Sequence, residues 1–254
     1  MSRRRTVAAL IGLPAVFVAV LVVEAWTAVR AEYLPTRPDY AIDRTVTPPN
    51  TTGPVVRMAV LGDSTVAGVG SPTAETTLPV LLAQRVAARL NRPVQVLGYG
   101  VSGGRTRTVR REQLPRVAQS LDVIVLVVGS NDVIHATPWW QMDERTRRLV
   151  EAARSQTGAP VVLGGIPQFR TVPAFAQPLR WVIGRYAAIL RSAQRRGVRG
   201  LPEVRYVDIA ALASPRFLGR PRSMSSDGFH PAPLGYGFWA DALAPAVAAA
   251  VRRA

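Results

Sequence analysis

The stretch Asp122–Val128 constrains the fold of this chain more than any other. It reads DVIVLVV, is apolar after its first residue, is rich in β-branched side chains and is followed by Gly129. A strand with one face in water would alternate apolar and polar residues, so a run without alternation indicates a strand buried on both faces. Burial of both faces requires helices on both sides of the sheet, as in parallel α/β proteins.

The body of the chain repeats the alternation of strand and helix that such a sheet needs. Short apolar runs predict four further strands, at Arg57–Leu61, Val94–Leu97, Pro160–Leu163 and Val204–Ile209. Periodicity and composition predict helices at Leu78–Leu90, Thr106–Ser120, Met142–Thr157, Gln177–Arg196 and Pro233–Arg253. We therefore expect a three-layer α/β/α sandwich with a five-stranded parallel sheet, in which the arginine-rich segment 106–120 is an exposed helix.

Residues 1–30 are predicted to be a short cytoplasmic stub and a transmembrane helix. Val7–Val23 is an uncharged apolar run that follows Arg3, Arg4 and Arg5. Its length is near the lower limit for a membrane span, and flanking arginines tend to stay in the cytoplasm. Because the run is longer than the apolar core of a cleaved signal peptide, a single-pass signal anchor with an extracytoplasmic domain is favoured over secretion after cleavage.

Residues 31–55 are rich in proline and threonine and predict a linker, and residues 56–254 predict one domain with its own core. The lack of cysteine excludes a disulfide framework and thiol catalysis, and the lack of lysine excludes Schiff-base chemistry. The net charge of +16 is explained first by arginine in place of lysine on solvated helix faces, and an anionic membrane surface is the alternative. Nucleic acid is not expected as a partner, since aromatic residues make up only 7% and no reading motif occurs. The oligomeric state stays open.

Polar residues follow the predicted strands at their carboxyl ends, where parallel α/β sheets bind ligands. Ser64 follows the first strand, Gly103 lies in a glycine-rich loop after the second, and Asn131 follows the third. Asp227 and His230 lie in the approach to the last helix. Ester hydrolysis needs a nucleophile, a base and donors for an oxyanion, and these five residues can supply all three.

His230 is the expected base, because the chain has only two histidines and Asp227 stands three residues before this one. That spacing lets the carboxylate orient the imidazole. Ser64 is the expected nucleophile. The backbone N–H groups of Ser64 and Gly103 and the side-chain amide of Asn131 are the expected oxyanion donors.

The roles of several neighbouring residues stay open. Asp132 is expected to be structural, and His135 to be structural or pocket-lining. Trp139 and Trp140 either pack against the sheet or line an acyl site. The loop 165–177, with two phenylalanines and two prolines, either borders the substrate or is a surface loop packed by its own aromatic side chains.

These motifs resemble the SGNH hydrolase superfamily, also called GDSL esterases and lipases. The resemblance covers about residues 56–245 and is carried by GDST at 62–65, GYGVSGG at 98–104, GSND at 129–132 and DGFHP at 227–231. Ser64, Gly103, Asn131 and His230 match the four family positions, and Thr65 stands where the family usually has leucine. The resemblance implies a flavodoxin-like sheet, a rather open site and a serine mechanism without metal or cofactor.

The function expected from the sequence is that of a membrane-anchored serine esterase. It would hydrolyse carboxylic esters, such as acylated sugars, envelope lipids or small esters, through an acyl-enzyme intermediate. Two alternatives remain. One is a catalytically silent, membrane-tethered binding module on the same scaffold. The other is a metal-dependent phosphoesterase that uses Asp63, Asp132, Asp227 and His230 as ligands.

A dinucleotide site is disfavoured, although Gly98, Gly100 and Gly103 have the spacing of that fingerprint. The acid expected about 20 residues further on would be Asp122. Asp122 begins a predicted strand, whereas a ribose-binding acid belongs at the carboxyl end of one.

Overall fold

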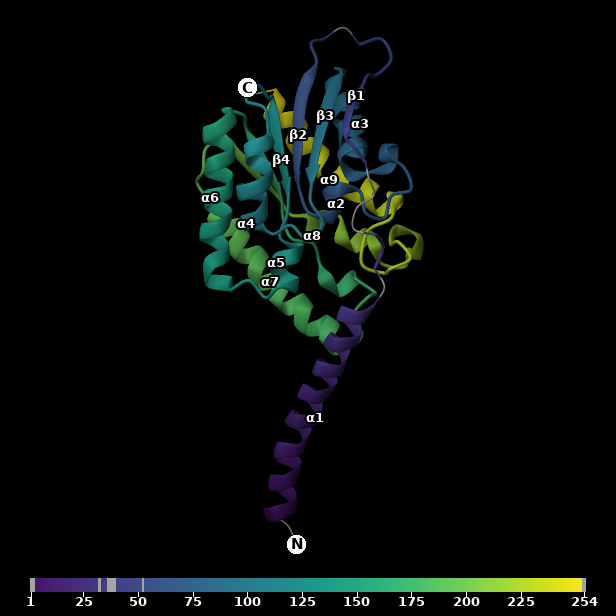
Figure 1. Ribbon diagram of the computed structural model, residues 1–254, viewed down its shortest axis with the longest axis vertical. Helices are drawn as coiled ribbons and strands as arrows, with labels where there is room; N and C mark the ends of the chain where they lie inside the picture. Colours follow the sequence, from purple (N-terminus) through teal and green to yellow (C-terminus); the bar gives the residue numbers. More distant parts are fainter. Residues whose placement is uncertain (1–2, 32, 36–39, 52, 253–254) are drawn as a thin grey trace.

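The structure is a computed structural model that describes residues 3–31, 33–35, 40–51 and 53–252, with the backbone alone for residues 3–15 and 29. Parts of the predicted stub, linker and chain end lie outside the described residues: 1–2, 32, 36–39, 52 and 253–254. A layered α/β domain carries a long helix that extends from one of its ends (Figure 1).

The domain is built around one mostly parallel sheet. Its strands are β1 (Asp43–Val46), β2 (Val56–Gly62), β3 (Val94–Gly100), β4 (Val123–Val127), β5 (Val161–Gly164) and β6 (Val204–Val207). They lie in the order β1-β3-β2-β4-β5-β6, and the five from β2 onward are parallel. Those five follow the flavodoxin-like order 2-1-3-4-5, so the expected parallel α/β sheet is confirmed.

The sheet has six strands, and the expected number of five was wrong. The additional strand, β1, pairs antiparallel with the outer edge of β3 and lies within residues 31–55, which the sequence predicted to be a linker. None of its four side chains is fully buried, so it lacks the apolar signal that marks a strand. Main-chain pairing at an edge leaves no such pattern in the sequence.

β4 has the environment that its sequence predicts. All five of its side chains are buried. The valines at 123, 125 and 127 join one core cluster, whereas Ile124 and Leu126 join the cluster on the opposite face. The strand is therefore enclosed on both sides.

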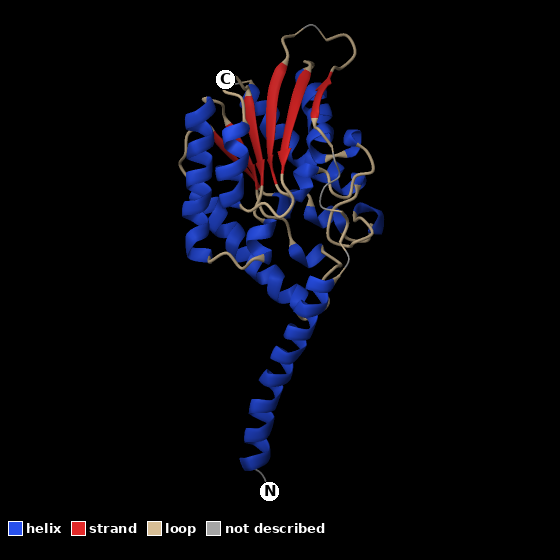
Figure 2. Ribbon diagram, in the orientation of Figure 1, coloured by secondary structure: helices blue, strands red, loops and turns tan. Residues whose placement is uncertain are grey.

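Helices cover both faces of the sheet. α3 (Leu78–Leu90) and α9 (Pro233–Val251) pack on one face. α6 (Trp139–Thr157) packs on the other face, beside α7 (Leu179–Gly197). Short helices follow individual strands: α2 (Ser64–Ala67), α4 (Thr106–Thr108), α5 (Ser130–Ile134) and α8 (Ile209–Leu212). The carboxyl ends of the parallel strands all point to the end of the domain from which the long helix extends (Figure 2).

The segment 106–120 is not the exposed helix that its composition predicted. It breaks into α4, a π-helical turn at Val109–Gln113 and a 3-10 turn at Leu114–Arg116, which contains a helix-breaking proline. Gln113 is fully buried, and its side chain accepts from Gly62 N–H at 3.0 Å and donates to Gly62 C=O at 2.7 Å. The segment thus fixes the end of β2 just before Ser64.

α1 (Arg3–Arg30) is a continuous helix of 28 residues. Apolar side chains along its described part are exposed, with Val16, Val22 and Val23 each at 60% or more. Its last turns contact α7, where Glu24 Oε2 accepts a hydrogen bond from Leu179 N–H at 2.7 Å.

A membrane location for α1 stays a prediction. Within the part of the chain that the structure describes, the helix long and apolar enough to cross a membrane by length and composition is α9, and α9 is mostly buried in the core. In α1, the stretch Val16–Ala28 is apolar but shorter than such a span.

We expect Gln113→Met to lower the free energy of unfolding by about 1–3 kcal/mol, measured by chemical denaturation. The substitution keeps the side chain similar in size and makes it apolar. It leaves Gly62 N–H without its partner, whereas Gly62 C=O keeps the N–H of Val101. Glu112→Met, at an exposed neighbouring position, is the control and should change stability by less than about 0.5 kcal/mol. Equal effects of the two variants would contradict a buried role for Gln113.

Candidate active site

The structure brings all the predicted site residues together at the carboxyl edge of the sheet. Ser64 follows β2, Gly103 follows β3, Asn131 lies in the first turn of α5 after β4, and His230 lies just before α9. All four line one cavity, beside the central strands where the strand order reverses.

A chain of hydrogen bonds joins three side chains. Asp227 Oδ2 lies 2.6 Å from His230 Nδ1, and His230 Nε2 lies 2.9 Å from Ser64 Oγ. Asp227 Oδ1 also accepts from the backbone N–H groups of Phe229 and His230, each at 2.9 Å. An ionised carboxylate only accepts, so the proton sits on Nδ1 and leaves Nε2 to accept from the serine hydroxyl.

The other histidine takes no part in this chain of hydrogen bonds. His135 is exposed at the end of α5 and lines none of the cavities beside Ser64. His230, in contrast, is only 6% exposed. The geometry therefore selects His230 between the two candidate bases.

Ser64 is held by the residues on either side of it. Asp63 caps α2, and its Oδ1 accepts from Thr65 N–H at 3.0 Å and from Thr65 Oγ–H at 2.8 Å. Ser64 is the first residue of that helix, where backbone N–H groups have no partner within the helix. Its N–H is thus free to bind an oxyanion.

The glycines of the second motif have two different structural uses. Gly98 and Gly100 lie inside β3, and a Cβ at Gly100 would lie 2.0 Å from Ala67 N, so glycine lets α2 pack against the strand end. Gly103 has φ +76°, in the left-handed region, and a Cβ there would meet nothing. Conformation, and not crowding, requires glycine at this loop position.

A buried carboxylate joins the loop that carries Gly103 to the helical turn that carries Asn131. Asp132 Oδ2 accepts from Thr106 N–H and Oγ–H, both at 2.8 Å, and Oδ1 accepts from Thr137 Oγ–H at 2.9 Å. Asn131 Nδ2 in turn donates to Gly104 C=O at 3.3 Å. These bonds fix the loop that carries Gly103 relative to Asn131.

The carboxyl groups that flank Ser64 have opposite pKa shifts. Burial raises the pKa of Asp227, but hydrogen bonds from the His230 side chain and from the backbone N–H groups outweigh it and hold that pKa well below the ordinary value. Burial raises the pKa of Asp63, and the hydrogen bonds from Thr65 only partly oppose the rise. Asp227 is thus the carboxylate that stays ionised beside the imidazole.

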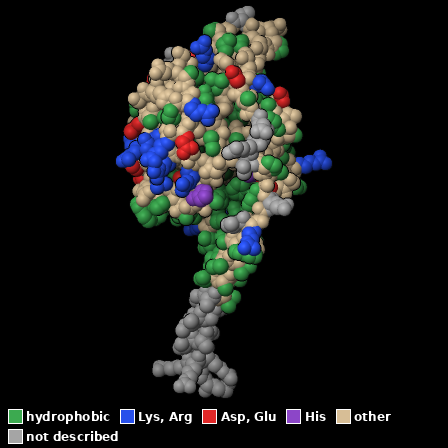
Figure 3. Space-filling view, viewed as in Figure 1, with side chains coloured by type: hydrophobic (Ala, Val, Ile, Leu, Met, Phe, Trp, Pro, Cys, Tyr) green, Lys and Arg blue, Asp and Glu red, His purple; other side chains and the backbone are tan. Residues whose placement is uncertain are grey.

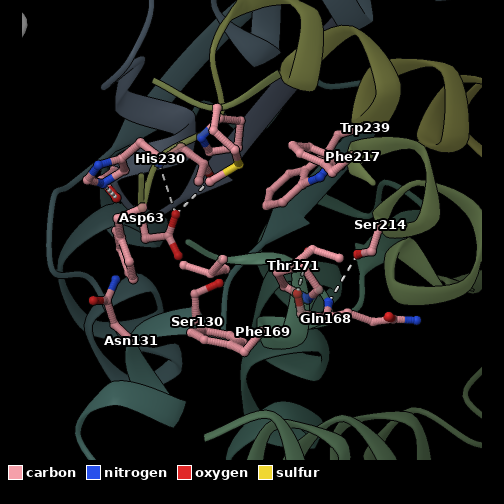
Figure 4. A pocket seen from close by; sticks show the side chains of 17 residues that line it. Asp63, Ser130, Asn131, Gln168, Phe169, Thr171, Ser214, Phe217, His230 and Trp239 are labelled. Carbon is pink, nitrogen blue, oxygen red and sulfur yellow. Dashed lines mark hydrogen bonds between the residues drawn. The ribbon is translucent and has the colours of Figure 1, made fainter. Parts of the chain in front are cut away.

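Two cavities open beside Ser64 and His230. The smaller, of about 40 Å³, has His230 and Asn131 at one end and Phe217 and Trp239 at the other (Figure 4). The larger, of about 270 Å³, is lined by Phe175 and Phe229 and reaches Ala28 of α1.

These cavities answer two questions that the sequence left open. Phe169 lines the smaller cavity and Phe175 the larger, so the loop 165–177 borders the site. Trp139 and Trp140 are about half exposed or more, and they line neither cavity.

Residues of the predicted linker reach the site, which the sequence did not indicate. Leu34 N–H donates to Asp227 Oδ2 at 3.3 Å, and the Tyr33 ring meets Phe229 edge to face at 5.5 Å between centroids. Burial, and secondarily the Asp227 carboxylate, raise the pKa of Tyr33. A tyrosine and a leucine just before a proline carry no pattern that could have revealed these contacts.

The ligand set of the phosphoesterase alternative is not gathered in one place. Each of the three carboxylates is hydrogen-bonded to a different partner: Asp63 to Thr65, Asp132 to the threonines at 106 and 137, and Asp227 to His230. In the part of the chain that the structure describes, no three acidic or histidine side chains form a group that could hold a metal ion.

A Ser–His–Asp chain at the carboxyl edge of a parallel α/β sheet is the arrangement of serine hydrolases. The family can also be stated. A sequence model of the GDSL-like Lipase/Acylhydrolase family matches residues 60–238, and the chain belongs to that family.

Individual proteins are also similar to this chain. The chain is 28% identical over 194 residues to the GDSL-like esterase Rv1075c of Mycobacterium tuberculosis. The matched region covers 74% of this chain and 60% of that protein. The fold is similar to that of the lipase Lip_vut3 from a goat rumen metagenome, with TM-score 0.61, 18% identity, and coverage of 77% of this chain and 98% of the lipase. It is also similar to that of phospholipase A1 from Streptomyces albidoflavus, with TM-score 0.59, 20% identity, and coverage of 74% and 98%.

Acid should weaken the fold through Asp227. Its pKa is lower in the folded state than the ordinary 3.8, so the carboxylate stabilises the fold above that pH and the contribution is lost as pH falls toward the folded-state value. We expect the free energy of unfolding, measured by denaturant titration from pH 5 downward, to fall less steeply for Asp227→Asn than for the wild type. The difference in slope is at most about 1.4 kcal/mol per pH unit, and parallel curves would contradict the depressed pKa.

Proposed function

We propose that the protein is a serine esterase that hydrolyses carboxylic esters. The observation that carries this proposal is the continuous hydrogen-bonded chain from Asp227 through His230 to Ser64, beside three candidate oxyanion donors. Packing alone does not account for this hydrogen-bonded triad, because well-packed apolar side chains usually stabilise a core at least as well as a buried charged pair.

The proposed reaction begins with attack of Ser64 Oγ on the ester carbonyl. His230 Nε2 takes the hydroxyl proton as the bond forms and then delivers it to the leaving alcohol. Water attacks the acyl-enzyme in the second half of the reaction, with His230 again as the base. The acid is released and Ser64 is regenerated.

The oxyanion and the imidazolium are stabilised by different groups. Backbone N–H groups of Ser64 and Gly103 and the amide of Asn131 face the developing negative charge, and loss of one such donor costs about 10²–10³ in rate. Asp227, ionised beside Nδ1, stabilises the positive imidazole and keeps its orientation.

The relatives support an ester substrate without defining it. An esterase, a lipase and a phospholipase A1 are among the similar proteins, and the substrates of these enzymes share the acyl ester group. Acylated sugars, envelope lipids and small esters are therefore all within the proposal.

Ser64→Ala tests the nucleophile. The wild-type chain should react with a fluorophosphonate probe and hydrolyse short aryl esters, and the variant should not be labelled and should lose at least about 10³ in kcat. Equal labelling of both proteins would contradict the mechanism.

A silent binding module and a metal enzyme predict other outcomes in the same assay. A folded wild-type protein that neither reacts with the probe nor turns over any aryl ester would favour the binding module. Activity that a chelator abolishes would favour metal chemistry.

We also infer that α1 anchors the domain to a membrane, with the domain outside the cytoplasm. Exposed apolar side chains on α1, followed by the exposed Trp26, support a bilayer segment with an interfacial aromatic residue. Trp139, Trp140 and Trp181 are exposed on α6 and α7. Both helices begin at the end of the domain that faces α1, where they would meet the same interface (Figure 1).

The orientation can be measured with a topology reporter fused after Ala254. Alkaline phosphatase, which folds only outside the reducing cytoplasm, should be active in this fusion, and green fluorescent protein secreted in unfolded form should be dark. The three arginines before α1's apolar run give this direction. The reverse pattern of signals would refute it.

A further inference from the structure

An apolar channel leads from Ser64 to the last turns of α1. The cavity of about 270 Å³ beside Ser64 adjoins a second one of about 450 Å³, and the two share the lining residues Ala28, Ile134 and Phe175. The second cavity is lined by side chains that are apolar apart from that of Tyr186, among them Ala25 and Ala28 of α1 and Leu179, Val182 and Ile183 of α7. Cavities of this size accommodate small-molecule ligands.

α1 itself forms one wall of this channel. Ala28 lines both cavities and Ala25 lines only the outer one, whereas α5 and α7 supply the opposite wall. Alanine side chains at these two positions leave the space between α1 and α7 open. The channel exists because the helix that leads away from the domain also packs beside the site.

Hydrogen bonds hold this wall in place. The Glu24 carboxylate accepts from Leu179 N–H at 2.7 Å, at the N-terminus of α7, where a negative charge is favourable. Tyr33 Oη donates to Ala28 C=O at 2.8 Å, and its ring packs against Phe229. The last turns of α1 are therefore tied to α7 and to the loop that carries His230.

We propose that this channel binds the acyl chain of an amphiphilic ester, and that the ester enters from the membrane leaflet that faces the domain. The proposal rests on the esterase function and the membrane anchor proposed above. With the carbonyl at Ser64, an acyl chain in the channel would run toward α1. Hydrophobic side chains predominate along the described part of α1 and continue onto the adjoining end of the domain, with a basic side chain at the junction (Figure 3).

The channel makes acyl length the expected basis of selectivity. Each methylene that moves from water into apolar surroundings contributes about fourfold to kcat/KM, until the chain fills the channel. The full-length protein in lipid nanodiscs should therefore prefer 4-nitrophenyl hexanoate and dodecanoate to the acetate.

Bulky residues on α1 test the wall directly. Ala28→Trp should lower the hexanoate-to-acetate ratio of kcat/KM by about tenfold or more, because it fills the space next to Ser64. Ala25→Trp, at the outer cavity, should instead lower the dodecanoate-to-hexanoate ratio. Thr27→Trp is the matched control, since Thr27 is exposed on the same helical turn and lines neither cavity, and it should keep both ratios.

The outcomes separate this proposal from the esterase proposal. Wild-type protein without activity on any ester would overturn the esterase mechanism. Active wild type with the same two ratios in all three tryptophan variants would overturn the channel alone. Ratios, unlike absolute rates, are insensitive to partial loss of folded protein.

The route of entry is tested with vesicles. Protein and a long-chain fluorogenic ester are reconstituted either in the same phosphatidylglycerol-containing vesicles or in separate ones. Lateral entry predicts at least about tenfold faster hydrolysis in the shared vesicles, because only there do enzyme and ester meet at a high effective concentration. Equal rates in the two arrangements would overturn entry from the leaflet.

Discussion

Burial of the central strands on both faces is the constraint on which the rest of the structure depends. Because β2 and β4 are covered by helices on each side, successive parallel strands must be joined by crossovers that run over a face. The five parallel strands then all end at the same edge. A serine, a glycine and an asparagine from three separate loops therefore lie close together there, although they are far apart in the sequence.

The two carboxylates next to the nucleophile show how the same group takes different roles in one site. Asp227 accepts hydrogen bonds from the backbone and from an imidazole, which overcome its burial and keep it charged. Asp63 is buried with Thr65 as its partner, and there burial outweighs the hydrogen bonds and raises the pKa. Threonine at position 65, where the family usually has leucine, supplies the hydroxyl that satisfies Asp63. This departure from the motif thus takes part in holding Ser64.

The sequence predicted the parts of the molecule that have a local pattern. Unbroken apolar runs such as that of β4 identified the parallel sheet, and short motifs at strand ends identified the residues that meet around Ser64. Three features lacked a local pattern: β1, which depends on main-chain pairing; Gln113, whose burial is set by distant Gly62; and Tyr33, which reaches the site only through the path of the chain. Each depends on a contact with a residue remote in sequence, and single-sequence periodicity does not contain such contacts.

β1 also has a consequence for how copies of this protein meet. A β-sheet edge with free main-chain groups can recruit another edge, and natural proteins prevent this with strands that are short and charged. β1 covers the edge of β3 with only four residues, and its exposed side chains include Asp43 and Arg44. An edge of this kind offers a neighbouring copy little to pair with, so aggregation through this side of the sheet is disfavoured.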